Sequence, residues 1–88
     1  MDIFIHDSAE KFLNKLDKKI QTNIKEHMKK LSENPYSKQL DIKKLKGLKN
    51  KPNLFRLRVG DYRIIYFIEE EKILVTEIMK REKGYGDF

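Results

Sequence analysis

Three of the four arginines of this chain stand within nine residues, in the segment FRLRVGDYR at positions 55–63, and most of its other basic residues are lysines. Arginine can bind a phosphate through two parallel hydrogen bonds, whereas lysine acts as a point charge. Guanidinium groups held on a rigid element can also stabilise the extra negative charge of a phosphoryl transition state. The segment therefore predicts a phosphate site.

A β-hairpin must position these arginines. The segments LFRLRV (54–59) and YRIIYFI (62–68) read as strands that flank Gly60-Asp61, a two-residue turn suited to type II′ geometry. Counting outward from the turn places Arg58 opposite Arg63 and Arg56 opposite Ile65. Alternation gives one face to the three arginines and the other to apolar residues that can pack on helices. These apolar residues are Phe55, Leu57, Val59, Tyr62, Ile64 and Tyr66.

The expected pair of Arg58 and Arg63 destabilises the hairpin by up to about 1 kcal/mol unless an anion or an acidic side chain lies between them. A bound phosphate would meet this requirement. In the structural alternative, the arginine stems cover apolar surface, extend into water and are neutralised by Glu69 or Glu77.

Two further residues can reach this sheet from its edge. Arg81 lies just beyond the last predicted strand, and Tyr85 follows four residues later. The candidate site therefore consists of Arg56, Arg58, Arg63, Arg81 and Tyr85.

The N-terminal segment reads as a strand followed by a helix. Ile3 and Ile5 alternate with their neighbours as in a short strand. Asp7, with Glu10 three residues later, is typical of an N-cap and capping box, so the helix should begin near Ser8.

The helical spacing of apolar residues continues to Leu31 and stops at SENP (32–35). A single helix of this length would outreach the core of so small a domain. We therefore expect a break near Asp17, which can cap a second helix.

Positions 36–53 mix a few apolar residues with lysines and read as a partly anchored loop. After EEEK (69–72), the segment ILVTEIM (73–79) reads as a further strand. EEEK can form loops of more than one length, so the register of this last hairpin stays open. The expected fold is α+β in a single domain over residues 1–88: an N-terminal strand, a helical hairpin and a three-stranded antiparallel meander.

The composition is that of a small soluble domain. Charged and apolar residues each make up 39% of the chain, and a net charge of +6 favours a polyanionic partner such as nucleic acid. The lack of cysteine excludes disulfides, thiolate metal sites and a cysteine nucleophile. No apolar run reaches the roughly 20 residues of a membrane span, and the first residues lack a signal-peptide layout, so the cytoplasm is expected.

Other polar residues are open to more than one interpretation. The lysine-rich segment 38–51 is either a solvated loop or an electrostatic rail for RNA phosphates. In the second case the RNA contacts are Lys43, Lys44, Lys46, Lys49 and Lys51. His6 and His27 lack metal-ligand spacing and are expected in surface or packing roles.

With LKG at 45–47, FRLRVGDYRIIY at 55–66, and Arg81 and Tyr85, the sequence resembles toxins of the RelE/ParE superfamily, most closely the RelE branch. The resemblance implies a RelE-like microbial RNase fold. It also implies a ribosome-dependent endoribonuclease that cuts messenger RNA in the A site, needs no cofactor or metal, and is held inactive by a RelB-like antitoxin.

The resemblance also assigns roles. The 2′-hydroxyl of the RNA attacks the adjacent phosphate and leaves a 2′,3′-cyclic phosphate and a 5′-hydroxyl. Arg56 and Arg63 match positions that stabilise the phosphorane. Arg81 matches a position that protonates or steadies the leaving oxygen, and Tyr85 one that stacks on or orients a base.

Arg58 departs from the family pattern, because some members carry a lysine there that is proposed as general base. The pKa of arginine, above about 12, keeps it protonated. Arg58 is therefore expected to bind phosphate or to lower the pKa of the 2′-hydroxyl, and the base is left open between Tyr85, Lys49 and Lys51.

Two other functions fit the same fold. One is a ParE-like inhibitor that binds DNA gyrase and has no nuclease activity, although Arg81 together with Tyr85 argues against it. The other is a non-catalytic basic RNA-binding module, which would bind RNA without cleaving it in any ribosomal context.

Overall fold

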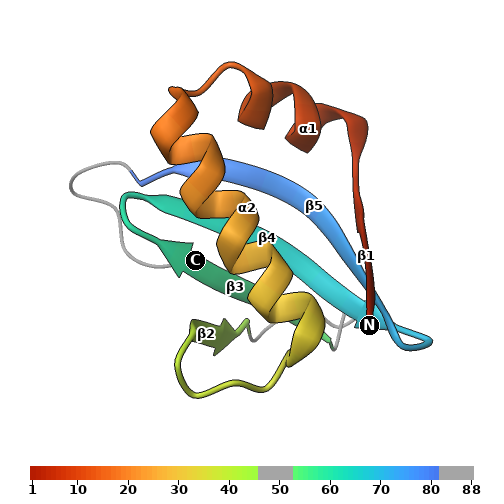
Figure 1. Cartoon of the computed structure of the whole chain (residues 1–88). Coiled ribbons are helices and arrows are strands. Elements are labelled where there is room, and N and C mark those ends of the chain that lie inside the picture. The colour runs from red at the N-terminus through yellow and green to blue at the C-terminus, as the bar shows by residue number, and fades with distance from the viewer. Residues whose placement is uncertain (46–52, 82–88) are drawn as a thin grey trace.

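The computed structural model of the chain describes residues 1–45 and 53–81. These described residues form two helices and one five-stranded sheet (Figure 1). The elements are β1 (Asp2–Ile5), α1 (Asp7–Asn14), α2 (Lys18–Glu33), β2 (Asp41–Lys44), β3 (Leu54–Val59), β4 (Tyr62–Glu69) and β5 (Lys72–Lys80). The strand order is β1-β5-β4-β3-β2, with β1 parallel to β5 and the other neighbours antiparallel.

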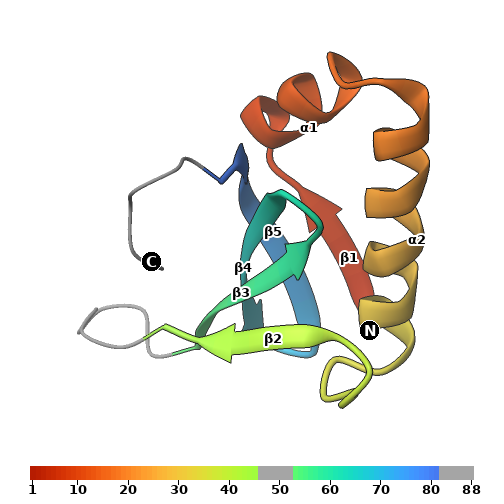
Figure 2. The same cartoon turned by 90° about the vertical axis from the view of Figure 1, so that its left-hand side faces the viewer.

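Both helices cover the same face of the sheet, which we call the helical face (Figure 2). The main core lies between the helices and this face. Its most deeply buried side chains are Leu13, Ile24, Leu31, Leu57, Ile64, Tyr66, Ile73 and Val75. Phe12 packs edge-to-face on Tyr62, with 6.4 Å between the ring centroids. The apolar spacing of the helices and the alternation of the strands thus meet in one core.

The predicted break between two helices is confirmed. Asp17 stands at the N-cap position of α2, although its side chain makes no capping hydrogen bond. The predicted cap of the first helix is wrong: α1 begins at Asp7, and its N-cap is His6, whose Nδ1 accepts a hydrogen bond of 3.2 Å from the backbone N–H of Ser8. An unprotonated imidazole nitrogen can satisfy a free N–H of a first helical turn as an aspartate oxygen would.

The predicted register of the central hairpin is confirmed at every position. Arg58 pairs with Arg63, Arg56 with Ile65, and the strands join at Gly60-Asp61. Gly60 has a φ of +58°, whereas Asp61 has no positive φ, as a type II′ turn requires. Glycine adopts this φ without steric strain, so the turn fixes the register.

Part of the segment predicted as a loop is a strand. Asp41–Lys44 forms β2, which pairs antiparallel with β3 and makes one edge of the sheet. The other edge is β1, whose parallel pairing with β5 joins the two ends of the described chain. These two edge strands extend the predicted meander to five strands.

The β4–β5 hairpin settles the register that the sequence left open. Its turn is Glu70-Glu71, and both residues have positive φ, at +51° and +61°. A β-bulge lies opposite Ile65 and Tyr66, where Ile65 pairs with Glu77 but Tyr66 pairs with Val75. The extra residue, Thr76, donates a hydrogen bond to the Ile65 carbonyl. The bulge places Glu77 on the face opposite the helices.

None of the helices in the described part of the chain is both long and apolar enough to span a membrane.

Candidate active site

Figure 2 shows one face of the sheet turned away from α1 and α2. By the strand register, Arg56, Arg58 and Arg63 lie on this face. We call it the arginine face. The prediction that the three arginines share one side of the hairpin is confirmed by the register, because Leu57 and Ile64 between them lie in the core on the opposite side. Arg58 and Arg63 are direct cross-strand neighbours, and Arg56 lies two residues along β3.

The arginines are far more buried than surface cations usually are. Arg56 and Arg63 are each 4% exposed, and the side chain of Arg58 is 30% exposed. The structural alternative, in which arginine side chains extend into water, is therefore wrong for Arg56 and Arg63. Burying a charge is costly unless it is paired or hydrogen-bonded, so the guanidinium groups of Arg56 and Arg63 need ion-pair or hydrogen-bond partners.

A second small apolar cluster lies beside the arginines on this face, with Ile65 opposite Arg56 and Met79 opposite Arg63. It consists of Leu45, Leu54 and Ile65, with Phe67 and Met79 packed against them. The cluster gives the guanidinium groups a surface of low polarity, where their attraction to an anion is stronger than in water. Strand alternation predicted apolar packing on the helical face alone, so this cluster was not predicted.

Asp41 supplies a carboxylate to the arginine face. Its Oδ1 lies 3.2 Å from Nη2 of Arg56, and its Oδ2 lies 3.9 Å from Nε of Arg58. Asp41 stands directly opposite Arg58 in the β2–β3 register, so both contacts follow from strand pairing. The predicted neutralising carboxylates are Glu69 and Glu77, and Asp41 was not among them because positions 36–53 were predicted to form a loop.

Arg81 follows β5 at the end of the sheet where the β3–β4 turn lies. Its backbone N–H donates a hydrogen bond of 2.6 Å to the Asp61 carbonyl. Arg58 and Arg63 are only one pair from that turn. The structure thus brings Arg81 to the same end of the sheet as these two arginines.

The predicted lysine contacts divide between the two faces. Lys43 pairs with Arg56 on the arginine face, whereas Lys44 pairs with Phe55, whose ring belongs to the helical face. Both lysines are exposed. Lys46, Lys49, Lys51 and Tyr85 lie outside the described residues.

The histidines have local roles, as expected. His6 caps α1, and Nδ1 of His27 lies 2.8 Å from the Asn23 carbonyl oxygen within α2. Across residues 1–45 and 53–81 no three His, Asp or Glu side chains are grouped to hold a metal ion.

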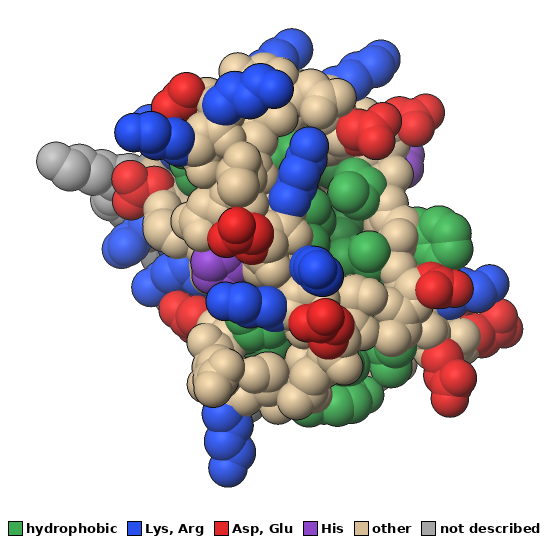
Figure 3. All heavy atoms as spheres, viewed as in Figure 1, with side chains coloured by type: hydrophobic (Ala, Val, Ile, Leu, Met, Phe, Trp, Pro, Cys, Tyr) green, Lys and Arg blue, Asp and Glu red, His purple; other side chains and the backbone are tan. Residues whose placement is uncertain are grey.

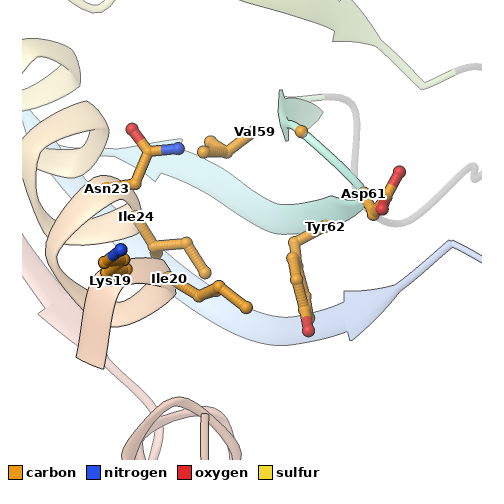
Figure 4. Close-up of a pocket in the computed structure, with 8 residues that line it drawn as sticks. Lys19, Ile20, Asn23, Ile24, Val59, Asp61 and Tyr62 are labelled. Atoms are coloured by element: carbon orange, nitrogen blue, oxygen red, sulfur yellow. The ribbon is translucent and has the colours of Figure 1, made fainter. Parts of the chain in front are cut away.

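The side of the molecule that carries the helices has acidic and basic side chains spread over it, with hydrophobic side chains visible between them (Figure 3). A pocket of about 310 Å³ lies between α2 and the β3–β4 turn, with Ile20, Ile24 and Tyr62 among its walls (Figure 4). Because Tyr62 belongs to the helical face, this pocket is separate from the arginine site.

Chemically, the arginine face can bind a phosphate and stabilise an increase of its negative charge. Two buried guanidinium groups and a third, partly exposed one are fixed on adjacent strands, so they need little reorganisation to receive an anion. None of these three side chains can act as a base at neutral pH.

Comparison with known proteins gives a family and a fold. Residues 3–85 match the family model described as the ParE toxin of the type II toxin–antitoxin system parDE. A search of curated proteins finds no match.

Two solved structures share 28% sequence identity with this chain. The archaeal RelE–RelB complex from Pyrococcus horikoshii OT3 has a TM-score of 0.80 and covers 94% of this chain and 97% of its own. The RelB–RelE antitoxin–toxin complex from Methanococcus jannaschii has a TM-score of 0.70 and covers 88% of each chain. The isolated E. coli RelE toxin, at 20% identity, has the same fold with a TM-score of 0.76 over 94% of this chain and 86% of its own. These likenesses confirm the predicted α+β fold.

Proposed function

The chain belongs to the ParE toxin family of type II toxin–antitoxin systems, and on this premise we propose that it is an endoribonuclease that cuts messenger RNA in the ribosomal A site. The membership confirms the resemblance to the RelE/ParE superfamily seen in the sequence. The likeness to RelE structures at 28% identity supports a RelE-type activity within that superfamily.

The observation that carries this proposal is the burial of Arg56 and Arg63 beside Arg58 on one rigid sheet. Such a cluster is expensive to fold, because charges lose hydration and like charges face each other. Burial and like-charge pairing of this kind are more frequent at functional sites than elsewhere. A phosphodiester that gains charge during its reaction is the ligand that would make best use of them.

The proposed reaction is a transesterification within the RNA. The 2′-hydroxyl loses its proton to a base, its oxygen bonds to the adjacent phosphorus, and the bond from phosphorus to the 5′-oxygen breaks. That oxygen takes up a proton, which leaves a 2′,3′-cyclic phosphate and a 5′-hydroxyl. The reaction as written needs no metal or cofactor.

The residues of the arginine face would share this work. Arg56 and Arg63 would stabilise the phosphorane, and Arg58 would bind the phosphate or lower the pKa of the 2′-hydroxyl. Arg81 would protonate or steady the leaving oxygen, and Tyr85 would stack on or orient a base. Tyr85, Lys49 and Lys51 remain the candidates for the base.

Further contacts are part of the same proposal. Lys43, Lys44, Lys46, Lys49 and Lys51 would contact RNA phosphates of the ribosome. A RelB-like antitoxin would hold the toxin inactive, as two similar structures are toxin–antitoxin complexes. The chain would act as a single domain in the cytoplasm.

A ParE-like inhibition of DNA gyrase is the second candidate, because the family model that matches is that of the ParE toxin. One experiment separates the two. The purified chain is incubated with programmed ribosomes, with free messenger RNA and, in parallel, with gyrase in a supercoiling assay. The nuclease predicts cuts confined to the A site with 5′-hydroxyl ends and unaffected supercoiling. Intact RNA on engaged ribosomes together with loss of supercoiling would replace it by the gyrase inhibitor.

A further inference from the structure

The arginine face already holds an anion, and that anion belongs to the protein. The Asp41 carboxylate contacts Nη2 of Arg56 at 3.2 Å and Nε of Arg58 at 3.9 Å. A phosphate oxygen would approach the same guanidinium groups at similar distances, because carboxylates and phosphates are bound by arginine in the same geometry. The two anions therefore compete for one set of donors.

We propose that Asp41 is a displaceable internal counter-ion of the arginine site, which a phosphate group of the substrate must replace when it binds. The inference rests on the proposed function in that it takes the phosphates of RNA to be the ligands of this site. It adds the regulation of that site: in the free protein Asp41 occupies guanidinium donors of Arg56 and Arg58 and lowers their affinity for phosphate.

The difference in solvent exposure indicates which side chain of the Asp41–Arg56 ion pair moves when phosphate binds. The side chain of Asp41 is 55% exposed, whereas that of Arg56 is 4% exposed. Asp41 also lies on a short edge strand that, within the described chain, pairs only with β3. Rotation of the Asp41 side chain into water therefore opens the site, while the buried guanidinium group of Arg56 stays in place on the central part of the sheet.

The surrounding charges explain why such a counter-ion is useful. Lys43 stands directly opposite Arg56, and Arg63 stands directly opposite Arg58, so like charges meet in two cross-strand pairs. Asp41 lies opposite Arg58 and diagonal to Arg56, where it reduces both repulsions. Without a carboxylate there, the cations would attract any available anion more strongly.

A purely structural role for Asp41 predicts the opposite effect on binding. If Asp41 only held the arginines in position, its loss would disorder them and weaken phosphate binding. If it competes with phosphate, its loss strengthens binding. Two unit charges about 4 Å apart in water correspond to about a fivefold change in a binding constant. The sign of the change therefore separates the two roles.

The test is an NMR titration of ¹⁵N-labelled protein with inorganic phosphate at neutral pH and constant ionic strength, followed at the arginine Nε–H resonances. Asp41→Asn should bind phosphate about fivefold more tightly than the wild type. Asp41→Glu, which keeps the charge, should bind like the wild type. Asp2→Asn is the matched control, because it makes the same change in net charge on the exposed edge strand β1 at the far side of the sheet.

Equal or weaker phosphate binding by Asp41→Asn, or equal tightening by Asp2→Asn, would overturn the inference. Should Asp41→Asn not fold, Asp41→Ser removes the same charge and is held to the same prediction. The titration contains no ribosome, so it is independent of the proposed nuclease: a wild type that cuts nothing on ribosomes contradicts the proposed function and leaves the phosphate comparison valid.

Discussion

Replacing Arg63 with methionine should stabilise the protein while removing most of its activity. Arg63 is 4% exposed and stands opposite Arg58, with Met79 as its neighbour on β5. A methionine at this position would join the apolar cluster that contains Met79. It would also remove the repulsion between Arg63 and Arg58, a cross-strand pair of like charges that costs up to about 1 kcal/mol. We expect the free energy of unfolding to rise by up to about 1 kcal/mol.

The same substitution removes a fixed donor from the phosphorane. Loss of one preorganised donor typically lowers kcat by about 10²–10³. Cleavage of A-site messenger RNA by Arg63→Met should fall by this factor, while ribosome association falls much less because many other cations contribute to it. Stability and activity are thus expected to change in opposite directions.

Urea denaturation followed by circular dichroism gives the change in the free energy of unfolding, provided that this free energy falls with urea concentration at the same slope in both proteins. Single-turnover cleavage on programmed ribosomes gives the change in activity. Lys29→Met, exposed on α2, controls for the loss of one positive charge and should change neither. A loss of more than about 1 kcal/mol in Arg63→Met would show that Arg63 is retained for structure, against the expected relief of repulsion. Undiminished cleavage would remove Arg63 from the site.

Three further predictions concern the leaving group, the core and a turn. Arg81→Ala should lower cleavage by about 10²–10³ with a much smaller effect on ribosome binding, measured as single-turnover rate and dissociation constant. Tyr66→Phe should raise the free energy of unfolding by about 1–2 kcal/mol in urea, because the Tyr66 hydroxyl is buried with no hydrogen-bond partner among the described residues. Burial, and less strongly Tyr36, raises the pKa of the Tyr66 hydroxyl. The free energy of unfolding of the wild type should therefore fall above a pH of about 10, because there the tyrosine ionises only in the unfolded chain. Tyr66→Phe should lack this part of the fall. The double change Glu70→Asn and Glu71→Gly should raise stability by about 1 kcal/mol, because both residues have positive φ in a two-residue turn.

Matched variants keep these predictions specific. Lys80→Ala, next to Arg81 and paired with Tyr62 on the helical face, should leave cleavage unchanged; an equal loss in both would assign the effect to net charge. Tyr62→Phe changes a tyrosine that is only partly buried, so a stabilisation as large as that of Tyr66→Phe would contradict the role of burial. The double change Glu70→Gln and Glu71→Gln removes both charges but does not favour a positive φ. If it raised the free energy of unfolding as much as Glu70→Asn with Glu71→Gly does, charge repulsion would be the cause.

The local features of the fold could be predicted from the sequence because each had a local cause. Gly60 fixed the hairpin turn, so the register of β3 and β4 followed by counting, and with it the common face of the arginines. The break at Asp17 followed from helix spacing and domain size. The cap by His6 was missed because Asp7 is the commoner N-cap residue.

The non-local features could not be predicted in the same way. β2 is four residues long and is stabilised by pairing with β3, so its own pattern of one apolar residue among charged ones is too weak to identify it. Asp41 was missed with it. The register of β4 and β5 depends on a bulge at Thr76 and on a turn of two glutamates, neither of which is typical of these residue types. The second apolar cluster, with Ile65 opposite Arg56 and Met79 opposite Arg63, forms only when the strands are assembled, so neither it nor the burial of the two arginines could be predicted from the hairpin alone.

The most direct test of the proposed mechanism changes the RNA and leaves the protein intact. Ribosomes are programmed with two messenger RNAs that differ only in the 2′-hydroxyl next to the scissile phosphate, which one of them lacks. We predict that the wild-type chain cuts the normal RNA to a 2′,3′-cyclic phosphate and a 5′-hydroxyl. The deoxy-substituted RNA should stay intact, although its ribosome binds the protein equally well. Cleavage of both RNAs at the same rate would contradict 2′-hydroxyl attack, and cleavage of neither would contradict the nuclease itself.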